Sequence, residues 1–195
     1  MRHLLDSLTR VARGQAEAVE LCNLGDILAQ SCLAAGVIER DDIALLLDVP
    51  LRIRLPAART RVENVFANLI VNAMEAMPGG GWIRITAVEA GQCVLVRVED
   101  NGPGIPAEIR GRLFEPFVTA RRRDGLGLGL AISRQSVREH GGDLWVEPAT
   151  GAHFVVSLPL LSPFAGRLSR IEGPSTECEA SLNAADCHSS PGSAN

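Results

Sequence analysis

Apolar residues recur at helical spacing, every third or fourth position, in several separate parts of the chain. This period places them on one face of a helix, which can then pack against a core. The helices predicted in this way cover residues 3–13, 24–35, 58–77 and 128–140. Gly36 is suited to end the second of them, and Gly141 with Gly142 is suited to end the last.

Between the helices lie short apolar or alternating runs bounded by turn residues, a pattern typical of β-strands. These runs cover residues 43–49, 51–55, 82–88, 93–100, 143–147 and 153–159. We expect the first two to form a pair of strands. Strands grouped in pairs between helices predict an α+β fold, a two-layer sandwich in which helices cover one face of a mixed sheet.

The composition is that of one packed domain with appendages. The chain has 195 residues, of which 46% are hydrophobic and 22% charged. After Pro159 the composition shifts to Ser, Gly, Pro, Asn and Ala without periodicity. Residues 161–195 are therefore predicted to form a disordered tail.

Charge and cysteine content exclude several classes of protein. The net charge of −4 gives no electrostatic reason to expect nucleic-acid binding. No apolar run approaches the ~20 residues of a membrane span, so no membrane segment is expected. The five cysteines are odd in number and contain no CxxC pair, which favours a reduced cytoplasmic protein over a disulfide scaffold.

A ladder of amides stands on the helix predicted over residues 58–77. Asn64, Asn68 and Asn72 are four residues apart and therefore share one face of that helix. Amide oxygens can coordinate Mg²⁺, which usually keeps several waters and bridges to nucleotide phosphates. The alternative is a set of helix amides satisfied by neighbouring backbone groups.

Two glycine-rich segments follow. In "DNGPG", Asp100 ends a strand, and Gly102 and Gly104 allow tight turns close to a ligand, although the segment also suits an ordinary β-turn. In "DGLGLGLAI", alternating glycines from Gly125 to Gly129 immediately precede a helix, whose exposed amides favour phosphate oxygens. The arginines at 121–123 between them suit either a phosphate site or a solvated basic loop.

The order and spacing of these segments resemble the catalytic ATP-binding domain of sensor histidine kinases. This domain belongs to the larger family of gyrase, Hsp90 and MutL, which shares the Bergerat fold with its mobile ATP lid. Residues 61–77 match the N box of that family, "DNGPGIP" the G1 box, "LFEPFVT" the F box and "GLGLGLAI" the G2 box. The resemblance covers residues 16–160 and is closest to the oxygen-sensing and nitrogen-regulation kinases.

The resemblance implies roles for individual residues in binding ATP and Mg²⁺. Asn72 would coordinate the Mg²⁺, Asn68 would support the ion or the phosphates, and Asp100 would bond the adenine amino group. A lid over residues 105–124 would carry Arg121 to the γ-phosphate, with Phe114 and Phe117 anchoring the lid. Asn68, Asn72 and Arg121 are the implied catalytic residues. The full implied site comprises Asn68, Asn72, Asp100, Gly102, Gly104, Ile105, Thr119, Arg121, Gly125, Gly127, Leu128 and Gly129.

Phosphoryl transfer is favoured over hydrolysis at this site. The gyrase, Hsp90 and MutL branch carries a water-activating glutamate four residues before the metal asparagine, where this chain has Asn68. Transfer to a protein histidine depends chiefly on positioning and charge stabilisation. A non-catalytic nucleotide-binding module and a serine kinase of the anti-sigma type remain alternatives, because both share such a site.

The acceptor histidine is expected on another domain. None of the chain's histidines stands in an acceptor context, and these are His3, His140, His153 and His188. His140 is expected at a helix C-terminus, where a cation is favoured by the helix dipole. Residues 1–15 resemble the end of a dimerisation hairpin, so the expected partners are a histidine-bearing phosphoacceptor domain and, indirectly, a response regulator. A homodimer is implied where that hairpin is intact. The "ATGAHF" loop departs from the family pattern, and we expect a shorter connection and weaker support of the phosphate loop there.

Overall fold

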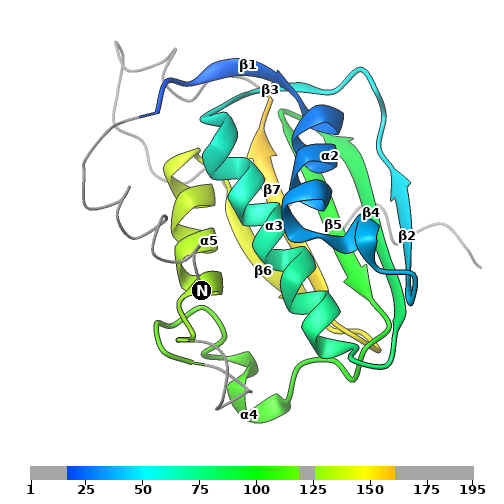
Figure 1. The fold of residues 1–195 in the computed structure, drawn as a ribbon. Coiled ribbons are helices and arrows are strands. Elements are labelled where there is room, and N and C mark those ends of the chain that lie inside the picture. Colours follow the sequence, from blue (N-terminus) through cyan, green and yellow to red (C-terminus); the bar gives the residue numbers. More distant parts are fainter. Residues whose placement is uncertain (1–16, 119–125, 161–195) are drawn as a thin grey trace, which may run out of the picture.

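The computed structural model describes residues 17–118 and 126–160. The helix predicted over residues 3–13, the hairpin segment 1–15 and the predicted tail 161–195 therefore lie outside the described residues. Within the described part, helices cover one face of a five-stranded sheet, as Figure 1 shows. The predicted α+β sandwich is confirmed. No helix of this part combines the length and the apolar character that crossing a membrane requires.

The helices predicted over residues 24–35, 58–77 and 128–140 are present as α2 (Leu24–Ala35), α3 (Arg59–Ala76) and α5 (Gly129–Glu139). The 3-10 turn η1 (Val37–Glu39) and the short α4 (Ala107–Arg110) were not predicted. The Asn23 side chain caps α2 by accepting hydrogen bonds from the amides of Gly25 and Asp26. Gly36 ends α2 in the left-handed conformation, at a φ of 73°, as predicted for a C-cap glycine.

The strands form one large mixed sheet and one small sheet. The strands are β1 (Glu20–Asn23), β2 (Ile43–Asp48), β3 (Arg54–Ala57), β4 (Gly81–Ala90), β5 (Cys93–Asp100), β6 (Asp143–Glu147) and β7 (His153–Pro159). The large sheet has the order β2-β4-β5-β7-β6, in which β2 and β4 are parallel and the other neighbours are antiparallel. β1 and β3 form the second, antiparallel sheet.

The prediction that the segments 43–49 and 51–55 form a pair was wrong. β2 lies beside β4, whereas β3 pairs with β1, a strand that the sequence pattern did not predict. Residues 51 and 52 form a turn after Pro50, which separates the two strands. Ile53 and Leu55 are nevertheless buried, so the alternation in "LRIRL" correctly indicates which side chains face the core.

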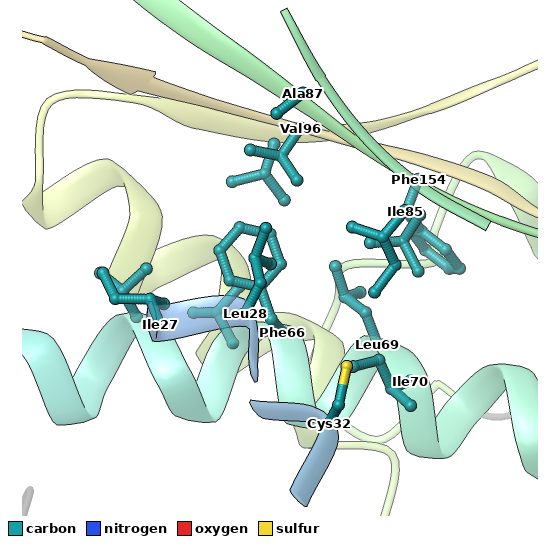
Figure 2. Close-up of a cluster of buried hydrophobic side chains, with 14 of the residues drawn as sticks. Ile27, Leu28, Cys32, Phe66, Leu69, Ile70, Ile85, Ala87, Val96 and Phe154 are labelled. Atoms are coloured by element: carbon teal, nitrogen blue, oxygen red, sulfur yellow. The ribbon is translucent and has the colours of Figure 1, made fainter. Parts of the chain in front are cut away.

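The core lies between the helices and the large sheet. Figure 2 shows Phe66, Leu69 and Ile70 of α3 meeting side chains of α2 and of the strands. The apolar residues on the inner face of α3 and at its C-cap are buried, and these are Val62, Val65, Phe66, Leu69, Ile70, Ala73 and Met77. Asn64, Asn68 and Asn72 therefore lie on the side of α3 that faces away from the apolar core.

α3 and α5 lie side by side on the sheet (Figure 1) and are joined by polar contacts. Near the start of α3, Arg61 pairs with Glu139 at 2.5 Å. His140, which follows α5, is only 6% exposed, and its Nε2 accepts a hydrogen bond from the amide of Ala58 at 3.0 Å. His140 thus lies at the C-terminus of α5, as predicted, and its Nε2 carries no proton in this arrangement because it accepts a hydrogen bond.

Candidate functional site

Asn68 lies at the contact between α3 and the start of α5. Its Nδ2 donates a hydrogen bond to the Oγ of buried Ser133 at 3.1 Å. Its Oδ1 lies so close to Gly129 that a Cβ on that glycine would come within 2.5 Å of the oxygen. A glycine is therefore required at the first residue of α5 for Asn68 to occupy its place. Asn64, one turn earlier on α3, is exposed.

Asn72 stands one turn further along α3 and has an unusual environment. Its amide nitrogen is buried, and in the described part of the chain it is the one buried side-chain nitrogen or oxygen without a hydrogen-bond partner. A buried polar atom without a partner is costly, and such atoms in native proteins call for a missing ligand, ion or water. The carboxamide of Asn72 is therefore suited to a polar ligand.

Asp100 ends β5 as a buried carboxylate that is only 2% exposed. Its Oδ1 accepts hydrogen bonds from the amides of Gly102 at 2.9 Å and Ala152 at 3.3 Å. Burial raises the pKa of Asp100 above its ordinary value, and the two backbone hydrogen bonds oppose that rise. Because both bonds use Oδ1, Oδ2 keeps its capacity to accept a hydrogen bond from a ligand.

The segment after Asp100 is held from two sides. A Cβ on Gly102 would lie 3.3 Å from the Cβ of Ala76, which places this segment against the end of α3. Gly104 has a φ of 76°, and a Cβ there would meet the carbonyl oxygen of Gly151 at 2.9 Å. Ile105 is half-buried and packs against the core.

The "ATGAHF" loop between β6 and β7 supports the Asp100 segment. Ala152 donates to the carboxylate of Asp100 and also accepts from its amide at 3.1 Å. Gly151 and Ala152 were not among the predicted site residues. The described contacts of this loop reach Asp100 and Gly104, and the expected weakening of the phosphate loop stays a prediction.

The glycine-rich segment before α5 is only partly described. Thr119, Arg121 and Gly125 lie outside the described residues. Gly127 has a φ of 65°, and a Cβ there would come within 2.7 Å of the backbone of Phe117. The amide of Phe117 donates to the carbonyl of Gly127 at 2.9 Å. Together with Leu128 and Gly129, this turn brings the residues before and after the undescribed stretch together at the N-terminus of α5.

The two phenylalanines expected to anchor the lid differ. Phe114 packs against the core, and its ring lies under the guanidinium of Arg134, which is 4.8 Å from the ring centroid. Phe117 is 74% exposed and has a φ of 66°, so the prediction that it anchors this segment was wrong. Its backbone is fixed by the contact with Gly127, which turns the side chain towards solvent.

A cleft of about 520 Å³ lies on the outer side of α5, against residues 111–116. Phe114, Leu128 and Ile132 contribute apolar surface to it, and Arg134 and Arg138 contribute charge. Among the sequence-predicted site residues, only Leu128 lines this cleft. The amides of α3 and the Asp100 carboxylate therefore belong to a different surface.

The candidate site extends along one side of α3. Asn68 lies beside the start of α5, Asn72 follows one turn later, and Gly102 lies beside Ala76 at the end of the helix. From Asn68 to Ala76 the helix rises by about 12 Å. The amides at the start of α5, which suit phosphates, thus lie at one end of the site. Asp100, which can accept from an amino group, lies at the other end, and Asn72 with its unpartnered Nδ2 lies between them.

These residues fit a nucleotide with a divalent cation. The unpartnered Nδ2 of Asn72 is a hydrogen-bond donor that suits a phosphate oxygen, and a cation would be held by the amide oxygen of the same side chain. Among the described residues, no cluster of three or more His, Cys, Asp or Glu side chains could hold a metal ion by itself. A cation here would take most of its ligands from phosphate oxygens and water, as Mg²⁺ does.

Comparison with known proteins identifies relatives of the chain. Residues 57–162 match the family model of the histidine kinase-, DNA gyrase B- and HSP90-like ATPases. The alginate biosynthesis sensor protein KinB of Pseudomonas aeruginosa is 38% identical over 167 residues, which cover 80% of this chain and 28% of KinB. The nitrogen regulation protein NtrY of Azorhizobium caulinodans is 31% identical over 75% of this chain and 20% of NtrY. The chain thus spans less than a third of the length of these curated relatives.

Solved structures give the same relationship. The catalytic domain of histidine kinase ThkA superposes with a TM-score of 0.65 at 32% identity, over 72% of this chain and 95% of that domain. Histidine kinase ThkA in complex with response regulator protein TrrA gives a TM-score of 0.66 at 29% identity, over 82% of this chain and 48% of that chain. The chain therefore belongs to the family of histidine kinase-, DNA gyrase B- and HSP90-like ATPases, and it has the ATP-binding Bergerat fold of the histidine kinase catalytic domains.

Proposed function

We propose that this chain is the catalytic domain of a sensor histidine kinase, which transfers the γ-phosphoryl group of ATP to a histidine on a phosphoacceptor domain. The observation that carries the proposal is the state of Asn68. This residue is an amide hydrogen-bonded to Ser133, in the position where the hydrolase branch of the family has a water-activating glutamate. An amide is no general base, so the site favours transfer over hydrolysis.

In this proposal, different residues along α3 bind the adenine, the Mg²⁺ and the phosphates of ATP. Asp100 accepts a hydrogen bond from the amino group of adenine through Oδ2, while its Oδ1 stays bonded to Gly102 and Ala152. The amide oxygen of Asn72 would hold Mg²⁺, and Gly127 and Gly129 would present backbone amides to phosphate oxygens. When bound, ATP supplies the phosphoryl group and Mg²⁺ neutralises charge on the phosphates.

Positioning accounts for most of the chemistry that the chain contributes. Phosphoryl transfer requires the acceptor, the phosphorus and the leaving oxygen to be in line, with the spreading negative charge stabilised. Asn68 and Gly129 fix the start of α5 against α3. This contact fixes the position of the phosphate-binding amides relative to Asn72. Arg121 adds a positive charge for the γ-phosphate in this proposal.

The partners in this proposal are a histidine-bearing hairpin domain and, downstream, a response regulator. The complex of histidine kinase ThkA with response regulator protein TrrA supports the second partner. The acceptor nitrogen would gain the phosphoryl group as the bond to the β-phosphate oxygen breaks, and ADP would leave. Such a domain would work in the cytoplasm, where ATP is available, and the hairpin would make it a homodimer.

The test is a transfer assay with a purified histidine-bearing hairpin domain, γ-labelled ATP and Mg²⁺. We expect acid-labile label on the hairpin and little free phosphate. Acid-stable label would instead indicate a serine kinase, and free phosphate without label would indicate a hydrolase. If ATP binds but neither product forms with any hairpin, a nucleotide-binding module is the better account.

A further inference from the structure

His140 makes two hydrogen bonds that fix the position of its proton. Its Nε2 accepts from the amide of Ala58 at 3.0 Å, and its Nδ1 lies 2.6 Å from the carbonyl oxygen of Ser136. A carbonyl only accepts, so Nδ1 carries the proton and donates it to Ser136. The imidazole is neutral, 6% exposed and bonded at both nitrogens. It is therefore poorly placed to serve as a nucleophile.

The bond to Ala58 satisfies an amide that α3 cannot satisfy itself. Ala58 is the N-cap residue of α3, is 3% exposed, and has no side chain that could cap the helix. A buried amide without an acceptor would be a lasting cost to the fold. The acceptor comes from a residue 82 positions later in the chain, so the bond is a tertiary tie between the end of α5 and the start of α3.

An ion pair also joins the two helices near the hydrogen bond between His140 and Ala58. Arg61 and Glu139 also join the two helices at this end, but their side chains are 41% and 39% exposed. Exposed ion pairs contribute little and are weakened by salt. His140 is thus the buried connection at this end of the helix pair among the described residues, and Asn68 with Ser133 is the connection nearer the other end.

We propose that His140 is a positioning residue for the nucleotide site. This inference rests on the function proposed above, because it concerns how that site is held. α5 has 11 residues and is about 16 Å long, so it moves as a rigid body. Because the C-terminal end of α5 is fixed to Ala58, the residues at its other end, Leu128 and Gly129, stay beside Asn68. Without the tie, α5 can pivot about the Asn68–Ser133 contact, which moves the phosphate-binding amides relative to Asn72.

The test compares His140→Leu, His140→Gln and Val137→Ala. Leucine removes the acceptor, whereas the Oε1 of glutamine can still accept from Ala58. Val137 is 1% exposed on the same helix, so its truncation lowers stability while the tie remains. For each variant we would measure unfolding by denaturant, ATP affinity in the presence of Mg²⁺, and deuterium exchange of the α5 amides without nucleotide.

The proposal predicts a specific pattern of results. His140→Leu should weaken ATP binding roughly two- to thirtyfold. It should also speed exchange at Ile132, the amide that donates to the carbonyl of Leu128 in the first turn of α5. His140→Gln should stay near the wild type in both, and Val137→Ala should lose stability but keep its affinity. The inference is overturned if His140→Leu binds ATP as tightly as Val137→Ala, or if glutamine is as damaging as leucine.

Two further readouts keep the inference separate from the proposed function. If the wild-type chain binds no ATP, the proposed function fails, but exchange at Ile132 and Ala58 in the nucleotide-free variants still tests the contact between His140 and Ala58. If His140→Leu does not fold, the nitrogen chemical shifts of the wild-type imidazole still report its tautomer. A proton on Nε2 would contradict the proposed tie.

Discussion

The Oδ1 of Asn68 and the backbone of Gly129 approach so closely that the two residues define the distance between α3 and α5. A Cβ at position 129 would stand 2.5 Å from that oxygen, well inside van der Waals contact. The same Asn68 side chain donates to Ser133 at 3.1 Å, so it cannot move away without losing a bond. The contacts of Asn68 with Gly129 and Ser133 therefore set both the spacing of α3 and α5 and the orientation of the Asn68 amide.

Gly129→Ala should lower both stability and ATP affinity. The added methyl group forces the Asn68 amide off Ser133 or pushes α5 outward, and such overpacking costs about 1–3 kcal/mol. Denaturant unfolding and ATP titration would measure the two effects. Gly111→Ala is the matched control, because a Cβ at Gly111 meets nothing within 4 Å. Equal behaviour of the two variants would show that the contact does not constrain the site.

Asp100→Asn should separate stability from nucleotide binding. Burial raises the pKa of Asp100, so the folded protein holds this proton to higher pH than the unfolded chain does. Its contribution to stability is present below the ordinary pKa of aspartate and is lost as pH rises through the raised folded value. The asparagine variant escapes this loss and should be at least as stable as the wild type at neutral pH.

The same variant should bind ATP about ten- to a hundredfold more weakly, because the amino group of adenine loses a charged acceptor. Urea unfolding between pH 3 and 8, paired with ATP titrations, would check both effects. The stability advantage of the variant should shrink at acid pH, where the wild-type carboxyl is also neutral. A variant that is destabilised at neutral pH yet binds ATP normally would contradict the assignment.

Asp143→Asn should destabilise the protein only above acid pH. Although burial acts to raise it, hydrogen bonds from Arg134 and Arg138 hold the pKa of Asp143 well below its usual range. A lowered folded pKa contributes stability that is present above the ordinary pKa and lost as pH falls through the folded value. Because the carboxylate is 40% exposed, solvent screening limits the expected loss to about 1 kcal/mol.

The measurement is urea unfolding of wild type and Asp143→Asn at neutral and acid pH. The difference should fall towards zero at the acid end. Asp48→Asn, at the exposed end of β2, is the control and should differ little from the wild type throughout. A gap between wild type and Asp143→Asn that is independent of pH would mean that the side chain acts through packing and not through charge.

Local patterns in the sequence predicted the elements that carry the site. The four-residue spacing of the asparagines placed Asn68 and Asn72 on the polar side of α3, because that spacing is a property of any helix. Asp100 was expected at a strand end, and β5 ends there. These predictions needed only the period of a helix or strand and the turn preferences of glycine.

Contacts between distant segments escaped prediction. Ser133 supports Asn68 from 65 residues away, and Ala152 supports Asp100 from 52 residues away. A buried serine or alanine has no distinctive pattern in the sequence. The pairing of β2 with β4 and of β3 with β1 was missed for the same reason, since strand partners are chosen by the packing of the whole domain.

The most direct test of the nucleotide site is ATP affinity with and without Mg²⁺ for the wild type, Asn72→Ala and Asn64→Ala. Asn64 is the control, because it is an exposed amide two turns earlier on the same helix. Our account predicts that Mg²⁺ strengthens ATP binding to the wild type and to Asn64→Ala but has little effect on Asn72→Ala. An unchanged gain from Mg²⁺ in Asn72→Ala would contradict the site that we place along α3.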